Sequence, residues 1–223
     1  MPRIPQGPAQ KGSQKWIQKV INENPELINS CIRTQLDLPG TENISWYSPL
    51  AEDEFAEYQD QAFLDLLDIK LPEASLADFW PQRGPCWDAL GKSDTRDIFL
   101  VEAKSHVPEM LSPGTGAGAE SLRKIKGSLN ETKVYLNSQS EHDWSSTFYQ
   151  YTNRLAHLYL LRVLNRVPAY LVFVYFLNDN EMNGPKSIGE WSGALKLLHS
   201  FLGTGRHKLS KYVTDLFIDV KML

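Results

Sequence analysis

The sequence has few cysteines and no long hydrophobic run. Its 223 residues include only Cys31 and Cys86, which are too few for a disulfide framework or a cysteine-based zinc site. The longest apolar stretch, residues 169–177, has the length of a strand, whereas a membrane helix needs about 20 such residues. The first residues are rich in proline and glutamine and contain no apolar segment like that of a signal peptide. We therefore expect a cytoplasmic protein without a membrane segment.

Positive charge is also scarce. The formal net charge is −4, so a surface coated with basic residues for binding DNA is not expected. A nuclease is not excluded, because a cluster of metal-binding carboxylates is itself acidic and local basic patches can steer an anionic substrate. Two such patches, each of which is also explained as a solvated helix face, are Lys11, Lys15 and Lys19, and Arg123, Lys124 and Lys126.

The composition is that of an ordinary globular protein. Hydrophobic residues make up 42% of the chain and charged residues 22%, close to the averages for such proteins. The length suits one large domain with elaborations. Residues 1–14 are rich in Pro, Gly and Gln, and we expect a disordered basic arm there. Residues 15–223 are expected to form a single domain with amino- and carboxy-terminal elaborations.

Hydrophobic periodicity and breaker residues divide the chain into elements. Helices are expected over residues 15–28 (interrupted at Pro25), 49–68, 121–136, 145–165 and 188–202. Strands are expected over residues 76–80, 86–90, 97–105, 169–177 and 213–220. Loops are expected over residues 37–48 and 112–119. The strands at 86–90 and 97–105 are expected to pair as a hairpin, from which a helical crossover leads to a parallel strand at 169–177. This order predicts an α/β fold with a mixed central sheet flanked by helices.

Three charged residues lie in strands that are otherwise apolar. Glu102 and Lys104 follow four apolar residues, and they point the same way because side chains alternate between the two faces of a strand. Asp88 is the one carboxylate of the strand at 86–90, and in a hairpin it lies beside Glu102. Two neighbouring carboxylates repel each other unless a cation lies between them, and oxygen ligands suit Mg²⁺ or Mn²⁺ rather than zinc. A buried salt bridge between Glu102 and Lys104 is the structural alternative.

A known pattern matches these three residues. Asp88 is separated by 13 residues from Glu102-Ala103-Lys104, and Pro85 lies three residues before Asp88. This arrangement resembles the motif of the PD-(D/E)xK nuclease superfamily, and the order of elements over residues 49–178 resembles the αβββαβ core of its restriction-endonuclease-like fold. The resemblance implies that Asp88, Glu102 and the carbonyl of Ala103 bind Mg²⁺, with Mn²⁺ as a substitute. It also implies that Lys104 orients the attacking water or stabilises charge on the phosphate.

Members of this superfamily often carry a further glutamate on the first helix. Glu52, Glu54 and Glu57 are the candidates within the helix expected over residues 49–68. Glu57 is favoured because it lies in the middle of that helix, although the helical wheel places Glu52 nearer the apolar stripe. For each of them a solvated helix face is the structural alternative.

Some branches of the superfamily also have a glutamine on the helix after the motif strand. In the helix expected over residues 145–165, Gln150, Asn153 and Arg154 share one polar stripe. We expect Gln150 to belong to the site, and Asn153, Arg154 and His106 to bind the phosphate of the substrate. A stripe that faces solvent explains the same spacing. The tryptophans at positions 80, 87 and 144 are expected in the core rather than stacked on bases.

These features predict a Mg²⁺-dependent nuclease that hydrolyses phosphodiester bonds, in the first place those of DNA. The alternative is a catalytically inactive module of the same fold that binds nucleic acid or a protein partner. An unrelated α/β enzyme is disfavoured because the sequence has no nucleophile elbow, dinucleotide fingerprint or nucleotide-binding loop. The oligomeric state stays open, and a homodimer would suit an enzyme that cuts both strands.

Overall fold

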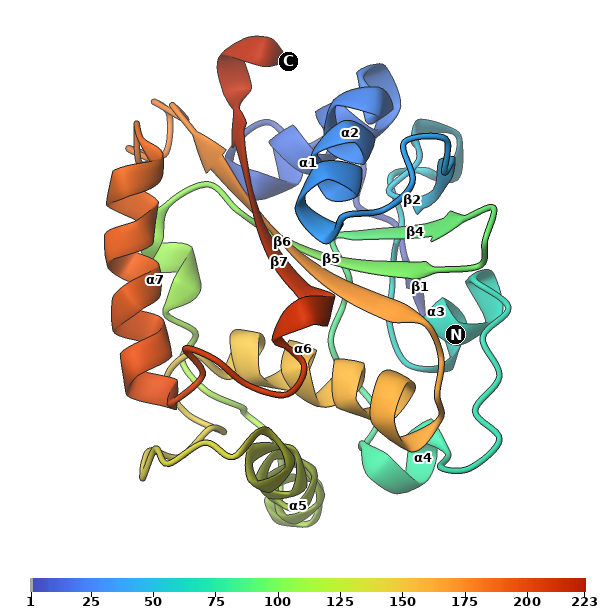
Figure 1. Cartoon of the computed structure of the whole chain (residues 1–223), viewed down its shortest axis with the longest axis vertical. Coiled ribbons are helices and arrows are strands. Elements are labelled where there is room, and N and C mark those ends of the chain that lie inside the picture. The colour runs from blue at the N-terminus through green and yellow to red at the C-terminus, as the bar shows by residue number, and fades with distance from the viewer. Residues whose placement is uncertain (1) are drawn as a thin grey trace.

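A five-stranded mixed sheet lies at the centre of the computed structural model, which describes residues 2–223 (Figure 1). Its strands are β2 (Ile44–Ser48), β4 (Ala89–Ser93), β5 (Ile98–Lys104), β6 (Ala169–Leu177) and β7 (Val213–Asp219), in the spatial order β2-β4-β5-β6-β7. Strands β2, β4 and β5 are antiparallel neighbours, whereas β5, β6 and β7 run parallel. The predicted α/β architecture with a mixed, helix-flanked sheet is confirmed.

Helices cover both faces of this sheet. They are α1 (Gly12–Glu23), α2 (Pro25–Leu36), α3 (Gln61–Leu66), α4 (Leu76–Phe79), α5 (Ala119–Leu136), α6 (Tyr149–Tyr159), which continues into a π-helical turn (Leu160–Leu164), and α7 (Ile188–Leu202). Short 3₁₀ turns span Ala51–Asp53, Val107–Met110, Ser210–Tyr212 and Val220–Met222, and β1 (Arg3–Ile4) and β3 (Glu57–Tyr58) form a separate two-stranded sheet. None of the helices in residues 2–223 is long and apolar enough to cross a membrane.

A hairpin forms around the charged residues, but its first strand is β4 and not residues 86–90, because Gly91 and Lys92 extend the pairing with β5 and Asp88 lies directly before the strand. β4 pairs with β5 in a register that places Ala89 opposite Val101, and the backbone N–H of Asp88 donates to the carbonyl of Val101 at 3.2 Å. The run Ile98–Val101 is buried and rich in strand-forming residues, which explains why this hairpin was predictable. Helices α5 and α6 then cross over to β6, which pairs parallel to β5.

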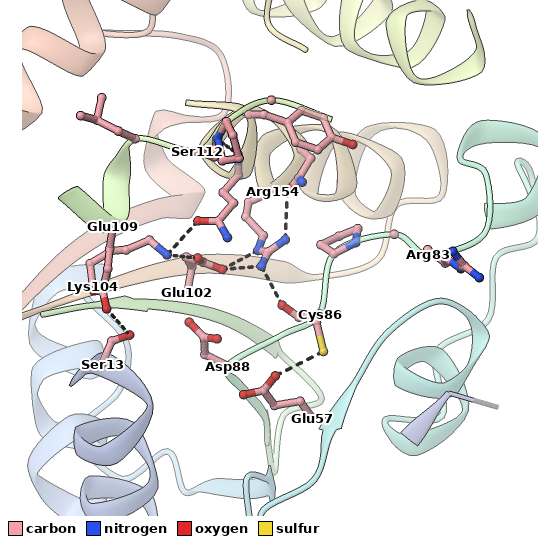
Figure 2. Close-up of a pocket in the computed structure, with 18 residues that line it drawn as sticks. Ser13, Glu57, Arg83, Cys86, Asp88, Glu102, Lys104, Glu109, Ser112 and Arg154 are labelled. Carbon is pink, nitrogen blue, oxygen red and sulfur yellow. Dashed lines mark hydrogen bonds and ion pairs between the residues drawn. The ribbon is translucent and has the colours of Figure 1, made fainter. Parts of the chain in front are cut away.

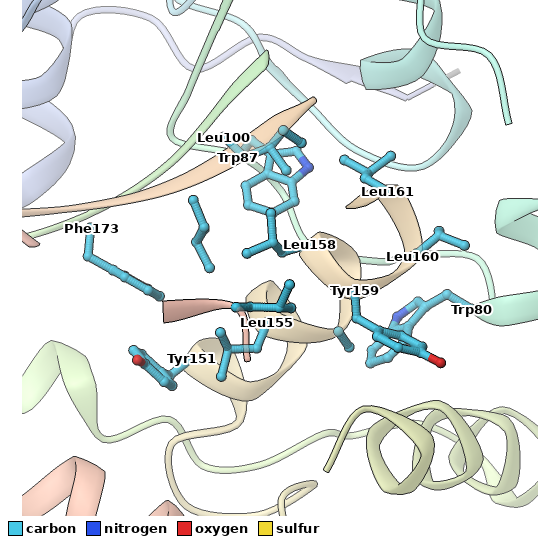
Figure 3. Close-up of a cluster of buried hydrophobic side chains, with 14 of the residues drawn as sticks. Trp80, Trp87, Leu100, Tyr151, Leu155, Leu158, Tyr159, Leu160, Leu161 and Phe173 are labelled. Atoms are coloured by element: carbon cyan, nitrogen blue, oxygen red, sulfur yellow. The ribbon is translucent and has the colours of Figure 1, made fainter. Parts of the chain in front are cut away.

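The side chains of β5 alternate between two hydrophobic cores, one on each face of the sheet. Phe99, Val101 and Ala103 pack on the face covered by α1 and α2. Leu100 points to the opposite face, where Leu155 and the other apolar residues of α6 form the larger core (Figure 3). The three tryptophans Trp80, Trp87 and Trp144 are buried in or against this larger core, as expected. Glu102 and Lys104 lie on the α6 side because they are two and four residues from Leu100.

The helix expected over residues 49–68 is wrong. In its place the chain forms a 3₁₀ turn (Ala51–Asp53), strand β3 and the short helix α3. Glu54, Phe55 and Asp60 have φ angles of 55°, 51° and 52°, a left-handed conformation that ends a right-handed helix. The pairing of β3 with β1 compensates for the backbone hydrogen bonds that a helix would have made.

Three other expectations are corrected. Residues 37–48 contain strand β2, which completes the sheet edge next to β4. Within residues 76–80, Leu76–Phe79 form helix α4, because the hydroxyl of Ser75 accepts from the N–H of Asp78 and caps the first turn. Residues 2–14, expected as a disordered arm, instead include β1 and the start of α1 and make side-chain contacts with Glu57 and Glu109.

One half-buried carboxylate outside the charged pocket makes stability depend on pH. Asp215 on β7 shares the α6 face with Val213 and Phe217, and burial raises its pKa to about 6. The folded protein therefore binds this proton more tightly than the unfolded chain does, so stability is lost as pH rises through about 6. We expect Asp215→Asn to raise the free energy of unfolding by about 1–3 kcal/mol at pH 8 and to change it little at pH 4.

Urea denaturation followed by tryptophan fluorescence measures this difference. Asp94→Asn, in the exposed turn between β4 and β5, serves as the control and should give no gain at either pH. An equal gain for Asp215→Asn at both pH values would show that the effect is not due to ionisation.

Candidate active site

The charged residues of β5 line a cavity of about 620 Å³ between the sheet and α6 (Figure 2). Three carboxylates reach its centre from separate segments of the chain: Glu57 from β3, Asp88 from the residue before β4, and Glu102 from β5. Lys104 lies on the same face of β5 as Glu102 and also lines the cavity. The hairpin therefore brings together the three residues on which the sequence motif depends.

Glu102 is the most buried carboxylate of the cavity, with 2% of its surface exposed. The Nε atom of Arg154 on α6 donates to its Oε2 atom at 2.7 Å, and the ammonium group of Lys104 contacts its Oε1 atom. Burial alone would raise the pKa of Glu102, but the positive charges of Arg154 and Lys104 outweigh it and hold that pKa below its usual value. Glu102 is therefore an ionised carboxylate whose two oxygens are already in use.

The guanidinium group of Arg154 is fixed on every side. Besides Glu102, it donates to the backbone carbonyl of Cys86 at 2.6 Å and to Oδ1 of Asn153 at 2.9 Å. Its central carbon lies 4.8 Å from the ring centre of Trp87, a distance that allows a cation–π contact. Arg154 thus connects α6 to β5 and to the segment before β4, and it neutralises a charge that would otherwise be buried alone.

Lys104 is held as a cation. Its Nζ atom donates to Oε1 of Gln150 at 3.0 Å in addition to its contact with Glu102. Burial would lower the pKa of Lys104, but the charges of Glu102 and Asp88 outweigh it and raise that pKa above its usual value. A protonated lysine can stabilise negative charge on a ligand, but it cannot accept a proton at neutral pH.

Asp88 has no cation of its own. Its Oδ2 atom accepts the backbone N–H of Ala103 at 2.7 Å, and in Figure 2 it lies between Glu57 and Glu102. Burial and the charge of Glu102 raise the pKa of Asp88 well above its usual value, more than Lys104 lowers it. The ionised form of Asp88 is therefore unfavourable unless positive charge is added to the cavity.

Glu57 is positioned mainly by the amino-terminal segment. The amides of Gln14 and Gln6 donate to its Oε1 and Oε2 atoms, each at 3.1 Å, and the thiol of Cys86 lies 3.3 Å from Oε2. Burial raises the pKa of Glu57. Glu57 therefore belongs to the cavity as predicted, but it lies on β3 and not on a helix.

A fourth carboxylate, Glu109, lies at the rim and was not predicted. It follows the motif strand in the 3₁₀ turn Val107–Met110, and its Oε2 atom accepts the backbone N–H of Ser105 at 2.6 Å. Ser13 at the start of α1 contacts its other oxygen at 3.3 Å. One signal for it is present in the sequence, namely an acidic residue directly after Pro108, just past the end of the strand.

Several predicted residues lie outside the cavity. His106 does not line it, and its Nδ1 atom lies 3.4 Å from Oε1 of Glu109. Glu52 and Glu54 are exposed and do not line it either. For Ala103 the prediction concerns the backbone carbonyl and stays a prediction; its methyl group packs on the opposite face of the sheet, in the core under α1 and α2. By contrast, Gln150, Asn153 and Arg154 all line the cavity, so the polar stripe of α6 faces inward and not toward solvent.

The carboxylates are not assembled as a closed metal site. Within residues 2–223, no group of three or more acidic, histidine or cysteine side chains is close enough to hold a metal ion as it stands. The donor chemistry nevertheless suits a hard cation, because all the free ligand atoms are oxygens and two of the carboxylates have raised pKa values. Asp88 and Glu57 are the residues that gain most from an added cation, whereas Glu102 is already neutralised.

Comparison with protein-family models, with curated proteins and with solved structures gave no match. The function of the cavity therefore has to be inferred from its own geometry and chemistry.

Proposed function

We propose that the protein is a Mg²⁺-dependent nuclease that hydrolyses phosphodiester bonds of nucleic acid, in the first place DNA, as a member of the PD-(D/E)xK superfamily. The observation that supports this most is the charge balance of the cavity. Four carboxylates and three cations line the cavity. Two of the cations, Lys104 and Arg154, contact Glu102, and the side chain of the third, Arg83, extends away (Figure 2). Among the described residues, Asp88 and Glu57 therefore have no ion-pair partner. Burying a carboxylate without an ion-pair partner costs free energy, so the presence of such carboxylates in one cavity favours a function that requires them.

A divalent cation would remove the unfavourable part of this arrangement. Asp88 and Glu57 would hold it, with Glu102 at the edge of the site, and each of the first two carboxylates would ionise as it bound. When bound, Mg²⁺ supplies a Lewis acid that polarises a phosphoryl oxygen and lowers the pKa of a water molecule.

Lys104 supplies a fixed positive charge beside the reacting phosphate. Glu102 and Gln150 hold its ammonium group from two sides, so little reorganisation is needed when negative charge develops on the substrate. Since its pKa is raised, Lys104 acts as an electrostatic stabiliser and not as the general base. Arg154 is a positioning residue, because its contacts with Glu102 and Cys86 leave it fixed in the wall of the cavity.

One observation favours a second candidate function. Both oxygens of Glu102 are engaged by Arg154 and Lys104, which is the pattern of a structural ion-pair network. A catalytically inactive module that binds nucleic acid or a protein partner would have such a network and would need no cation. The two candidates differ in whether Asp88 and Glu57 bind a metal.

Metal dependence tests the proposal. We expect the purified protein to degrade single- or double-stranded DNA in the presence of Mg²⁺ or Mn²⁺, to stop when the metal is chelated, and to recover when it is added back. The activity should coincide with the protein peak in gel filtration, which controls for a contaminating nuclease. If neither metal supports hydrolysis of DNA or RNA, and calorimetry detects no binding of Mn²⁺, the binding module is the correct function.

A further inference from the structure

Two more cavities adjoin the carboxylate cavity, and all three meet at Arg83. The first, which we call the side groove, has a volume of about 520 Å³ and lies between α3 and α4. The second has a volume of about 610 Å³ and is lined by residues 114–118 and the start of α5. The segment Pro81–Arg83 separates these two, and of its residues only Arg83 also lines the carboxylate cavity.

The backbone at Arg83 is held firmly while its side chain is left free. The carboxylate of Asp60 accepts the N–H of Arg83 at 3.0 Å and that of Gly84 at 2.8 Å. A side chain at Gly84 would approach Oδ1 of Asp60 to 3.1 Å, so glycine allows this close contact. Among residues 2–223, no side chain pairs with the guanidinium group of Arg83, which is exposed and extends away from Asp88 and Glu102 in Figure 2.

A free guanidinium group beside an acidic cavity can bind one phosphate of an anionic chain. The carboxylates repel a phosphate that has no metal beneath it, whereas Arg83 attracts the neighbouring phosphate through up to two charge-assisted hydrogen bonds. The structure thus offers two positions for phosphates of one strand. The reacting phosphate would lie at the carboxylates, and the neighbouring phosphate would be bound by Arg83 without reacting. This contact is local, which agrees with a net charge of −4 for the whole chain.

The lining of the side groove matches a nucleobase. Apolar surface comes from Leu76, Ala77, Trp80 and Pro81, and free amide groups come from Gln59 and Gln82. The one carboxylate of the groove, Asp60, already accepts two backbone N–H groups. Apolar walls cover the faces of a planar ring, while amides offer both donors and acceptors to its edge. Glutamine can satisfy any base in this way, so the groove suits recognition that does not depend on sequence. A base within a duplex is stacked and paired, and only an unpaired base can enter.

We propose that Arg83 binds the phosphate next to the reacting one and that the side groove receives the adjoining unpaired base, so that the protein selects single-stranded nucleic acid. This inference rests on the proposed function in one respect, namely that the ligand is nucleic acid. It does not require that the protein hydrolyse the strand.

Binding of short oligonucleotides to the full chain, measured by fluorescence anisotropy in the presence of a chelator, tests the inference without cleavage. The probes are a labelled single-stranded oligothymidylate and a blunt duplex of equal length. Arg83→Ala removes the phosphate contact, and Ala77→Trp fills the side groove from the exposed face of α4. Arg206→Ala is the matched control, because Arg206 is also exposed but lines none of the three cavities.

We expect the single strand to bind about tenfold more tightly than the duplex, since only its bases can enter the groove. Arg83→Ala should weaken binding of the single strand about tenfold, as expected for a charge-assisted contact, and should reduce the salt dependence by about one phosphate contact. Ala77→Trp should weaken binding of the single strand but not of the duplex. Arg206→Ala should change neither.

The inference is overturned if the single strand and the duplex bind equally, if neither binds, or if Arg83→Ala behaves like Arg206→Ala. Its failure can be told apart from failure of the catalytic proposal. A protein that hydrolyses DNA with Mg²⁺ but has no preference for single strands retains the catalytic function and loses this inference. A protein that binds single strands through Arg83 and never cleaves them shows the reverse.

Discussion

Asp88→Asn is expected to lower the rate of Mg²⁺-dependent hydrolysis by about a thousandfold or more, because it removes the carboxylate that most needs the metal. The substitution is a mild one for the fold. The amide oxygen of asparagine can still accept the N–H of Ala103, which lies 2.7 Å from Asp88 in the wild-type protein. Burial and the charge of Glu102 raise the pKa of Asp88, so removal of its ionised form should not reduce stability at neutral pH.

Lys104→Met separates binding of the metal from chemistry. It keeps much of the aliphatic length but removes the ammonium group that Glu102 and Gln150 hold. We expect hydrolysis to fall by a similar factor while calorimetry still detects bound Mn²⁺, whereas Asp88→Asn should abolish both. Asp94→Asn is the control for Asp88, since Asp94 is an exposed aspartate in the turn after β4. Full activity in Asp88→Asn would contradict the assignment of the site.

Arg154→Met is expected to destabilise the protein by about 3–5 kcal/mol, the usual effect of removing one partner from a buried ion pair. The reason is the burial of Glu102, of which only 2% is exposed. Without Arg154 this carboxylate keeps only Lys104 as a cation, and the carbonyl of Cys86 loses the guanidinium N–H that lies 2.6 Å from it. The free energy of unfolding from urea denaturation measures the loss.

A second substitution identifies the cause of this loss. The double variant Glu102→Gln with Arg154→Met should regain part of the lost stability, since the buried carboxylate that Arg154 neutralised is then uncharged and Asp88 remains to balance the charge of Lys104. Arg206→Met, at an exposed position, should leave stability within about 0.5 kcal/mol of the wild type. If Arg154→Met alone costs less than about 1 kcal/mol, the network is not the structural link between α6 and β5 that we describe.

The elements that could be predicted are those whose sequence signal is local and dense. The apolar runs of β5 and β6 and the periodic face of α6 are of this kind, and their positions agree with the structure. They also fix which residues share a face. For that reason the sequence predicts that Asp88, Glu102 and Lys104 lie close together, and all three line one cavity in the structure.

The elements that could not be predicted depend on partners far away in the sequence. The apolar residues around Phe55 and Tyr58 have helical spacing, yet Tyr58 pairs with Arg3 in a two-stranded sheet. Hydrophobic periodicity is a local pattern, so it does not indicate a pairing between residues that are far apart in the sequence. The ion pair of Arg154 with Glu102 was missed for the same reason, since it spans 52 positions; the sequence predicted that Arg154 binds the phosphate of the substrate, and nothing in its spacing indicated a partner on β5.

The amino-terminal segment gives the cavity a wall that is separable from the rest of the fold. Arg3 and Ile4 pair with β3, and Gln6 contacts Glu57, before helix α1 begins at Gly12. These contacts are polar, and Arg3 and Gln6 are exposed, so lifting residues 3–10 costs far less than unfolding the sheet. A truncated protein, or one with a bulky tag fused at its amino end, would thus keep its core and the contact of Gln14 on α1 with Glu57, while losing the contact from Gln6. Assays of the site require the chain with its first residues intact and any tag placed at the other end.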